Sequence, residues 1–279
     1  TVTLAKTGDT VTLTIATNEN VSSPTVTFTS GGAAATNADT VSGASPGTSF
    51  TSAYTVDASD TDGTVAISIT ATDVAGNTTS GFTTISAGSV TVDQTAPASQ
   101  KTQGVVTTGG DNQVAGYWNS GNTGVDITVP IADDSSINGG TVQLLVSTDG
   151  GGSFVPLDTP STISAVNTNK TISVAGGVLE GVAGFGESDV LQFKATITDT
   201  SGNATTGTVS DTTLTVDQTA ATISTSSIAS DNETVTLAKT GDTVTLTIAT
   251  NENVSSPTVT FTSGGAAATN ADTVSGASP

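Results

Sequence analysis

One 46-residue segment occurs twice in this chain without a single change. Residues 1–46 return as residues 234–279, so the sequence repeats with a period of 234 − 1 = 233 residues. A stretch of this length with no substitution indicates recent duplication, or continued homogenisation, within a long array of repeats. The folded units of such an array need not begin where the exact repeat begins, so their boundaries must come from a second signal.

A weaker repeat supplies that second signal. Segment 91–97 (TVDQTAP) returns as 215–221 (TVDQTAA), and each is preceded by a related loop, TDVAGN at 72–77 or TDTSGN at 198–203. The period therefore contains two alternating modules, of about 123 and 110 residues. Both are long enough to close a core of their own.

These signals divide the chain into three parts. Residues 97–219 are expected to form one complete module, and residues 1–96 a module that lacks its first strand. Residues 220–279 are the N-terminal half of a repeated module, because 234–279 repeats 1–46. Half a module leaves strand edges unpaired, so the sequence predicts that the parent protein continues in both directions.

Apolar residues recur at every second position along much of the chain. Val11, Leu13 and Ile15 follow this pattern, and so do segments 65–71, 127–131, 142–146 and 191–197. Period-2 alternation between Gly, Asn, Asp and Ser turns is typical of half-buried antiparallel strands. The predicted strands of the first part are 10–17, 25–30, 35–42, 49–56, 64–72 and 88–93, and 221–229 is predicted to be the first strand of the following copy. The fold class is therefore all-β.

Composition excludes several classes of function. Lys and Arg number 5 against 25 Asp and Glu, a net charge of −20, so polyanions are repelled and nucleic acid is excluded as a partner. No apolar run approaches the roughly 18 residues of a membrane span, so no membrane insertion of this segment is expected. His and Cys are absent, which removes imidazole and thiolate metal sites and the usual nucleophilic triads. The chain is predicted not to be an enzyme.

The linkers, the two related loops and segment 57–70 (DASDTDGTVAISIT) resemble tandem bacterial immunoglobulin-like repeats. Such repeats form the extender regions of giant extracellular adhesins and related repeat-fibre proteins. The resemblance covers essentially the whole chain and implies tandem immunoglobulin-like β-sandwiches arranged end to end, at the surface of a bacterium or outside it. It also implies partners: further copies of the repeat in the same chain, and neighbouring chains if a filament forms.

The resemblance further implies calcium at the module junctions, and carboxylates do occur in every segment that should meet there. Calcium takes about six to eight oxygen ligands. At the first junction the candidate ligands are Asp57, Asp60, Asp62, Asp93, Asp133, Asp134, Asp199 and Asn203. At the second they are Glu187, Asp189, Asp217, Asn251 and Glu252, with Asp73 and Asn77 as equivalents of the loop missing from that copy.

Each of these residues has an alternative explanation. Asp and Asn are common in turns because their side chains hydrogen-bond to the nearby backbone and tolerate left-handed conformations. That alternative holds for any single residue, whereas their joint placement at the expected junctions favours calcium.

Two hypotheses of function remain. The main one is a structural extender or shaft segment of a long extracellular bacterial adhesin or filament, made rigid by Ca²⁺ at its junctions. The alternative is a carbohydrate- or protein-binding adhesion module, in which Tyr117 and Trp118 would stack on a sugar ring. A lone Trp in a sandwich also commonly fills the core. Unchanged copies favour the shaft, because every copy of a spacer does the same work.

Overall fold

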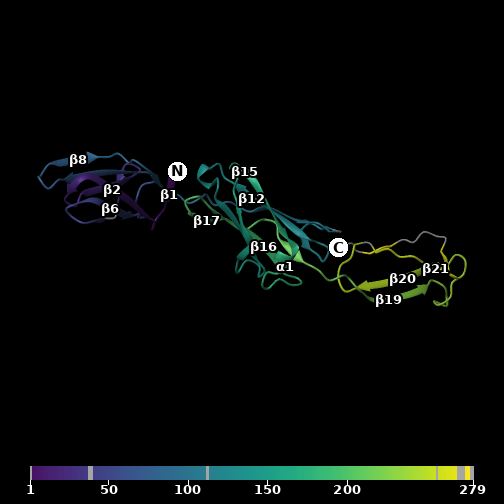
Figure 1. Ribbon diagram of the computed structural model, residues 1–279. Coiled ribbons are helices and arrows are strands. Elements are labelled where there is room, and N and C mark those ends of the chain that lie inside the picture. The colour runs from purple at the N-terminus through teal and green to yellow at the C-terminus, as the bar shows by residue number, and fades with distance from the viewer. Residues whose placement is uncertain (1, 37–39, 111–112, 256, 269–273, 277–279) are drawn as a thin grey trace. The chain divides into compact units, whose positions relative to one another are not determined.

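A computed structural model describes residues 2–36, 40–110, 113–255, 257–268 and 274–276 (Figure 1). The chain divides into two compact units, Thr1–Asp217 and Gln218–Pro279. Strands dominate the first unit, and helix in the described part of the chain is confined to α1 (Gly176–Glu180) and the 3₁₀ turn η1 (Ser135–Ile137). The all-β prediction is therefore confirmed. No helix in the described segments is long and apolar enough to cross a membrane.

Residues 2–92 form the first sandwich, whose two sheets share one core. One sheet has the order β2-β6-β5 and the other β1-β9-β7-β3-β4, with β8 beside β7. Every pairing is antiparallel except that of β1 with β9. The bounds are β1 (Val2–Ala5), β2 (Thr10–Val21), β3 (Thr25–Ser30), β4 (Ala33–Ala34), β5 (Thr40–Ser42), β6 (Gly47–Thr55), β7 (Gly63–Thr72), β8 (Thr78–Phe82) and β9 (Ser89–Val92).

Alternation along the strands decides which side chains enter this core. Val65, Ile67 and Ile69 on β7 are buried, as the sequence pattern predicts. From the facing sheet come Phe50 and Tyr54 on β6, among other residues. The Tyr54 ring packs against that of Phe28 with a centroid separation of 4.9 Å. Residues 26 positions apart in sequence thus meet in one apolar layer.

Residues 103–216 form the second sandwich, whose described strands likewise make one three-stranded and one six-stranded sheet. Its sheets have the orders β10-β12-β15 and β11-β18-β16-β13-β14, with β17 beside β16. These orders, with β11 parallel to its neighbour β18 in the same sheet, are those of an immunoglobulin-like sandwich. The bounds are β10 (Gln103–Thr108), β11 (Tyr117–Trp118), β12 (Gly124–Ile131), β13 (Thr141–Ser147), β14 (Val155–Thr162), β15 (Thr168–Ala175), β16 (Val190–Thr198), β17 (Ala204–Thr206) and β18 (Leu214–Val216).

Predicted strand boundaries differ from the structure at two places. The strand predicted at 35–42 is replaced by β4, which pairs with β3, and β5, which pairs with β6, so this segment passes from one sheet to the other. Residues 37–39 of that prediction lie outside the described residues. The strand predicted at 10–17 continues to Val21, because an irregularity between Ala16 and Val21 allows pairing with β6 to resume at Gly47.

The C-terminal unit, residues 218–279, contains little paired structure. Strands β19 (Ile223–Ser230) and β20 (Val244–Thr250) form a two-stranded sheet, and β21 (Thr262–Ser263) pairs with β22 (Ala266–Ala267). The third strand expected here from the equivalence with β3 is reduced to β21. In the first sandwich β1 and β3 pair with β9 and β7, which come from sequence beyond residue 46. The repeated segment has no such partners among the described residues of its own unit.

Candidate functional site

The linker after the first sandwich, residues 93–95, is bound to the loop 57–62 of that sandwich. The Asp62 carboxylate accepts hydrogen bonds from the Gln94 backbone N–H at 2.8 Å and from the Thr95 hydroxyl at 2.6 Å. The Gln94 side-chain amide donates to the Asp60 carbonyl at 2.7 Å, and its oxygen accepts from the Thr7 hydroxyl. Two of the three linker residues are therefore held by side chains and backbone of the first sandwich.

The third linker residue, Asp93, is bound by the second sandwich. The Ser201 hydroxyl donates to the Asp93 carboxylate at 2.6 Å, and the Asn203 side-chain amide donates to the Asp93 carbonyl at 2.9 Å. Between these donors lies Gly202, where a Cβ atom would come within 3.0 Å of Cε of Lys6 in the first sandwich. The structure thus brings together the 57–62 loop, the linker and the 199–203 loop.

The 199–203 loop is pre-formed by hydrogen bonds of its own. The buried Asp199 carboxylate accepts from the backbone N–H groups of Ser201 and Asn203, both at 2.8 Å, and from the Asn203 amide at 2.9 Å. This Asx-type arrangement fixes the direction of the two side chains that reach Asp93. Asp199 therefore orders the loop through hydrogen bonds to residues of the loop itself.

The same loop occurs in the first sandwich at residues 73–77. The Asp73 carboxylate accepts from Ala75 N–H and Asn77 N–H at 2.8 Å, and from the Asn77 amide at 2.7 Å. The Asn77 side-chain bond, followed by the backbone bonds, lowers the pKa of Asp73 below its usual value. Ala75 stands where the second sandwich has Ser201, so this loop lacks the hydroxyl that binds a linker carboxylate.

Other candidate ligands of the first junction are engaged elsewhere. Asp57 binds the backbone and hydroxyl of Ser59, and the hydroxyl bond is the main cause that lowers its pKa. Asp60 is buried, which alone would raise its pKa, but hydrogen bonds from Thr36 and from Asp57 N–H lower it on balance. Its carboxylate therefore braces a loop within the first sandwich rather than the linker.

The remaining two candidates of that junction lie in the η1 turn of the second sandwich. Asp134 caps the turn by accepting from Ser136 N–H at 2.9 Å and from the Ser136 hydroxyl at 2.7 Å. Asp133 beside it is exposed. The Asp134 carboxylate is thus engaged within its own turn.

A second acidic segment precedes the other linker. The Ser188 N–H donates to the Val216 carbonyl, and Val216 N–H donates to the Asp189 carbonyl, both at 2.8 Å. This pair of bonds holds the segment Glu187–Asp189 against the strand that leads into Asp217, whose own N–H donates to the Trp118 carbonyl at 2.8 Å. One carboxylate oxygen of Asp189 is buried without a hydrogen-bond partner.

In the C-terminal unit, Asn251 and Glu252 follow β20. The Asn251 side-chain oxygen accepts from Thr222 N–H at 2.6 Å, and one Glu252 carboxylate oxygen is buried without a partner. Across the described parts of the chain, no three acidic residues lie close enough together to form a metal site by themselves. The donors that the sequence reasoning missed, Gln94, Thr95 and Ser201, are neutral. The signal for Gln94 and Thr95 is the Asp-Gln-Thr sequence that recurs at 217–219, whereas Ser201 is not part of it.

Trp118 is completely buried in the core of the second sandwich, and its indole N–H donates to Glu180 on α1 at 3.1 Å. The core-filling interpretation of this residue is confirmed. Its neighbour Tyr117 is 45% exposed. Of the two rings proposed to stack on a sugar, only that of Tyr117 is therefore exposed.

Comparison with known proteins gives likenesses in structure alone. No protein-family profile matches the sequence, and no curated protein does. Domains A168–A170 of titin match with 14% identity and a TM-score of 0.40, over 77% of this chain and 62% of theirs. A tetra-tandem repeat from the extending region of a large adhesion protein matches with 20% identity and a TM-score of 0.27, over 87% and 60%. The tandem Ig repeats of Dlar match with 14% identity and a TM-score of 0.21, over 78% and 94%.

Proposed function

We propose that this chain is an extender segment of a long extracellular bacterial adhesin or filament, in which tandem sandwiches act as a shaft. The observation that carries the proposal is the bonding of the linker from both sides. Gln94 and Thr95 are bound by the first sandwich, while Asp93 is bound by Ser201 and Asn203 of the second. Hydrogen bonds are directional, so a linker held at three consecutive residues resists bending more than a free one.

The recurrence of the same elements supports this function. The Asp-Gln-Thr sequence of the linker occurs twice, and 46 residues are repeated without change. A shaft needs many equivalent joints, whereas a receptor-binding module needs one distinctive surface. The buried Trp118 takes away the aromatic platform on which the carbohydrate-binding alternative depended.

The proposal includes a calcium ion bound at the second linker. Asp189 has a buried carboxylate oxygen with no partner, and the Val216 hydrogen bonds hold its segment against the strand that leads into Asp217. Because no three acidic residues of the described segments form a metal site by themselves, carbonyl and hydroxyl oxygens would have to complete the ligand set. These are all oxygen donors, the type that calcium prefers. Bound there, the cation would neutralise carboxylates of a chain that carries a net charge of −20. At the first linker a cation would have to share Asp62 and Asp93 with the donors already bound to them.

The shaft proposal is tested by ¹⁵N relaxation, which reports how residues 2–92 and 103–216 tumble. We expect one common rotational correlation time for the two sandwiches of the intact chain, and two separate times after Asp93→Ala combined with Asn203→Ala. Asp211→Asn is the control, because it removes a carboxylate that pairs with Lys101 on the surface of the second sandwich. Independent tumbling in the unaltered chain would contradict the proposal.

The calcium part is tested separately by calorimetric titration. Extracellular modules bind calcium with dissociation constants of about 0.1–1 mM, and we expect a value in this range that Asp189→Asn weakens at least about tenfold. Asp158→Asn is the matched control, since Asp158 already has a positive φ of 61° that Asn tolerates. A chain that binds no calcium would remove the cation from the proposal and leave the hydrogen-bonded linker in place.

A further inference from the structure

Four strands of the second sandwich lie at the ends of its two sheets. They are β10 and β15 in one sheet and β11 and β14 in the other, and among the described residues no strand pairs with their outer sides. An edge strand presents unpaired backbone N–H and C=O groups, to which a strand of another molecule can bind. The connection from β14 to β15 is only residues 163–167, so the sequence between them holds no further strand that could cover either edge.

Three of these edges are poor templates for pairing. Strand β11 is only two residues long. Strand β14 contains Pro156 and Pro160, which have no backbone N–H, and its register with β13 is irregular near Asp158, whose φ is 61°. In β10 the register shifts at Gly104, which has a φ of 47°. Short strands, proline and bulges are the usual features that keep sheet edges from pairing.

Strand β15 has none of these features. Its eight residues, Thr168–Ala175, include no Pro or Gly and pair with β12 in an unbroken register, from Thr168 opposite Ile131 to Ala175 opposite Gly124. Several of them are Thr, Ile or Val, which favour strands. In the first sandwich the corresponding strand, β6, lies between β2 and β5 and is therefore covered. A long, regular and open edge such as β15 is where pairing with another chain is expected.

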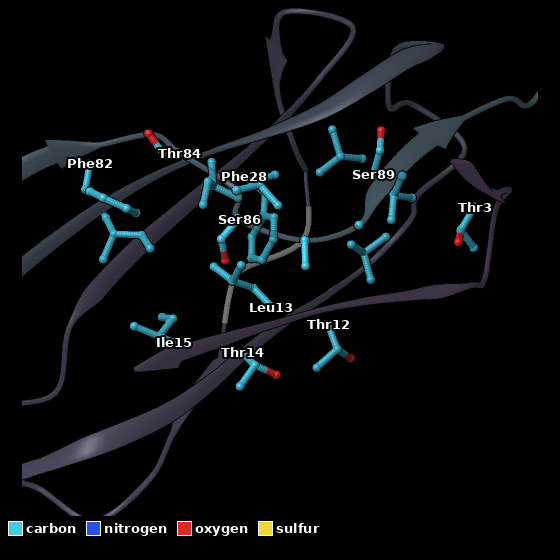
Figure 2. Close-up of a pocket in the computed structure, with 18 of the residues that line it drawn as sticks. Thr3, Thr12, Leu13, Thr14, Ile15, Phe28, Phe82, Thr84, Ser86 and Ser89 are labelled. Atoms are coloured by element: carbon cyan, nitrogen blue, oxygen red, sulfur yellow. The ribbon is translucent and has the colours of Figure 1, made fainter. Parts of the chain in front are cut away.

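Alternation along β15 places one charged side chain on its core face. In a strand, successive side chains point to opposite faces, as in β2 of the first sandwich, where Leu13 points toward Phe28 and Thr14 points away from it (Figure 2). Residues directly opposite each other in an antiparallel pair share a face. Lys170 lies opposite Val129, which is 1% exposed, so Lys170 is on the core face, where it is half-buried.

A charge at this position requires the edge to stay open. A lysine can lay its carbon chain along apolar side chains, such as Ile172 two positions further on the same face, while its ammonium reaches water. A strand added beside β15 would separate that ammonium from water. Among the described residues no carboxylate lies within salt-bridge distance of Lys170, since the ion pair they contain is that of Lys101 with Asp211. Removing an ammonium from water without an anionic partner is costly.

We propose that Lys170 prevents β15 from pairing with β15 of a second copy of this chain. Two identical edges can join about a twofold axis, and here they would turn two three-stranded sheets into one of six strands. In that pair each copy would cover the Lys170 of the other, and two like charges would lie on one face of the sheet. Lys170 therefore keeps copies apart at an edge that neither proline, nor a bulge, nor short length protects. This role goes beyond the shaft function and does not depend on it.

Sedimentation of Lys170→Val tests the proposal. Valine favours strands and removes the charge, so we expect this variant to associate with a Kd at least about tenfold lower than that of the unaltered chain. Lys194→Val is the matched control, because it makes the same change at a half-buried residue of β16, which lies between β13 and the strands β17 and β18. Lys170→Glu keeps an unpaired charge on the core face and should behave like the unaltered chain. The proposal would be overturned if Lys170→Val associated no more strongly than the unaltered chain, Lys194→Val or Lys170→Glu.

Hydrogen exchange identifies the edge that pairs. In Lys170→Val we expect the protection of amides in residues 168–175 to rise with protein concentration, while protection in β10 and β14 stays unchanged. The emission of the buried Trp118 reports whether the sandwich remains folded. Lys170→Thr, which introduces a residue that already occurs twice in β15, is a second variant for the same measurement in case Val disturbs the fold. Protection that rises at β10 or β14 instead, or none that rises at β15 in a folded variant, would also overturn the proposal.

Discussion

The hydroxyl of Ser201 donates a 2.6 Å hydrogen bond to the carboxylate of Asp93, 108 positions earlier in the chain. The residue equivalent to Ser201 in the first sandwich is Ala75, in a loop whose Asp and Asn make the same internal bonds. The two alternating modules therefore share a loop scaffold but differ in the one side chain that reaches a linker carboxylate. Ser201→Ala therefore removes only the hydroxyl that contacts the linker and leaves the internal hydrogen bonds of the loop in place.

Ser201→Ala is expected to weaken the joint by about 0.5–1.5 kcal/mol, the usual contribution of one hydrogen bond. A double-mutant cycle with Asp93→Ala isolates the interaction, with the free energy of urea unfolding of the second sandwich as the measurement. Ala75→Ser serves as the control, since it adds the same hydroxyl to the sister loop. A coupling energy of zero would show that the 2.6 Å contact does not contribute to stability.

The repeated segment provides an internal comparison of the same residue in two settings. Phe28 is buried against Tyr54, whereas the identical Phe261 is half exposed and lies outside any strand. Phe28→Ala should therefore destabilise the first sandwich by about 3–5 kcal/mol. Phe261→Ala should alter the unfolding free energy by less than about 1 kcal/mol. Denaturant unfolding followed by NMR signals of each unit measures both, and equal losses would contradict the described burial.

That comparison also shows what sequence can and cannot predict here. Alternation correctly predicts the buried faces 65–69 and 191–197, because a strand with one face toward a core leaves this pattern in the residues themselves. It cannot predict that residues 25–30 form a strand while the identical 258–263 mostly do not. The pairing partner of the first copy, β7, is supplied by sequence that the second copy lacks.

The contacts of the linker are a second feature that the sequence pattern does not predict. Asp57, Asp60 and Asp134 are predicted as ligands because they carry carboxylates. In the structure, each carboxylate accepts a hydrogen bond from a residue of its own loop or turn. The residues that hold the linker include Gln94, whose only signal is the recurring Asp-Gln-Thr sequence, and the uncharged Ser201. Their role depends on which loops meet at the junction, and this is a property of the tertiary structure.

The single Trp of the chain offers a local probe of the second sandwich. Trp118 is completely buried and donates to Glu180, so its fluorescence should be blue-shifted and protected from iodide quenching. Trp118→Ala should cost about 3–5 kcal/mol of stability through the cavity it creates. Trp118→Phe, which keeps most of the volume, should cost less. Emission typical of a solvated indole would contradict the burial and reopen the sugar-stacking alternative.

The last prediction concerns pH and the loop around Asp73. The Asn77 amide, together with backbone N–H groups, lowers the pKa of Asp73 below its ordinary value of 3.8. A carboxylate whose pKa is lower in the folded state stabilises that state above the unfolded pKa, and the stabilisation is lost as pH falls through the folded value. Asp73→Asn should therefore lower the Tm of the first sandwich at pH 7, and the difference from the unaltered chain should disappear well below pH 3.8.

Removing one negative charge from a chain of net charge −20 has its own effect on stability, which a matched variant must measure. Asp158→Asn removes the same charge from an exposed carboxylate that accepts from its neighbour Thr159. Repulsion among carboxylates is strongest at pH 7, where they are ionised, and removing one charge reduces it. Asp158→Asn should therefore raise the Tm at pH 7, whereas Asp73→Asn should lower it. Scanning calorimetry of both variants between pH 2.5 and 7 separates the two effects. If Asp73→Asn follows the control at every pH, the hydrogen bonds from Asn77 and Ala75 do not stabilise the ionised carboxylate.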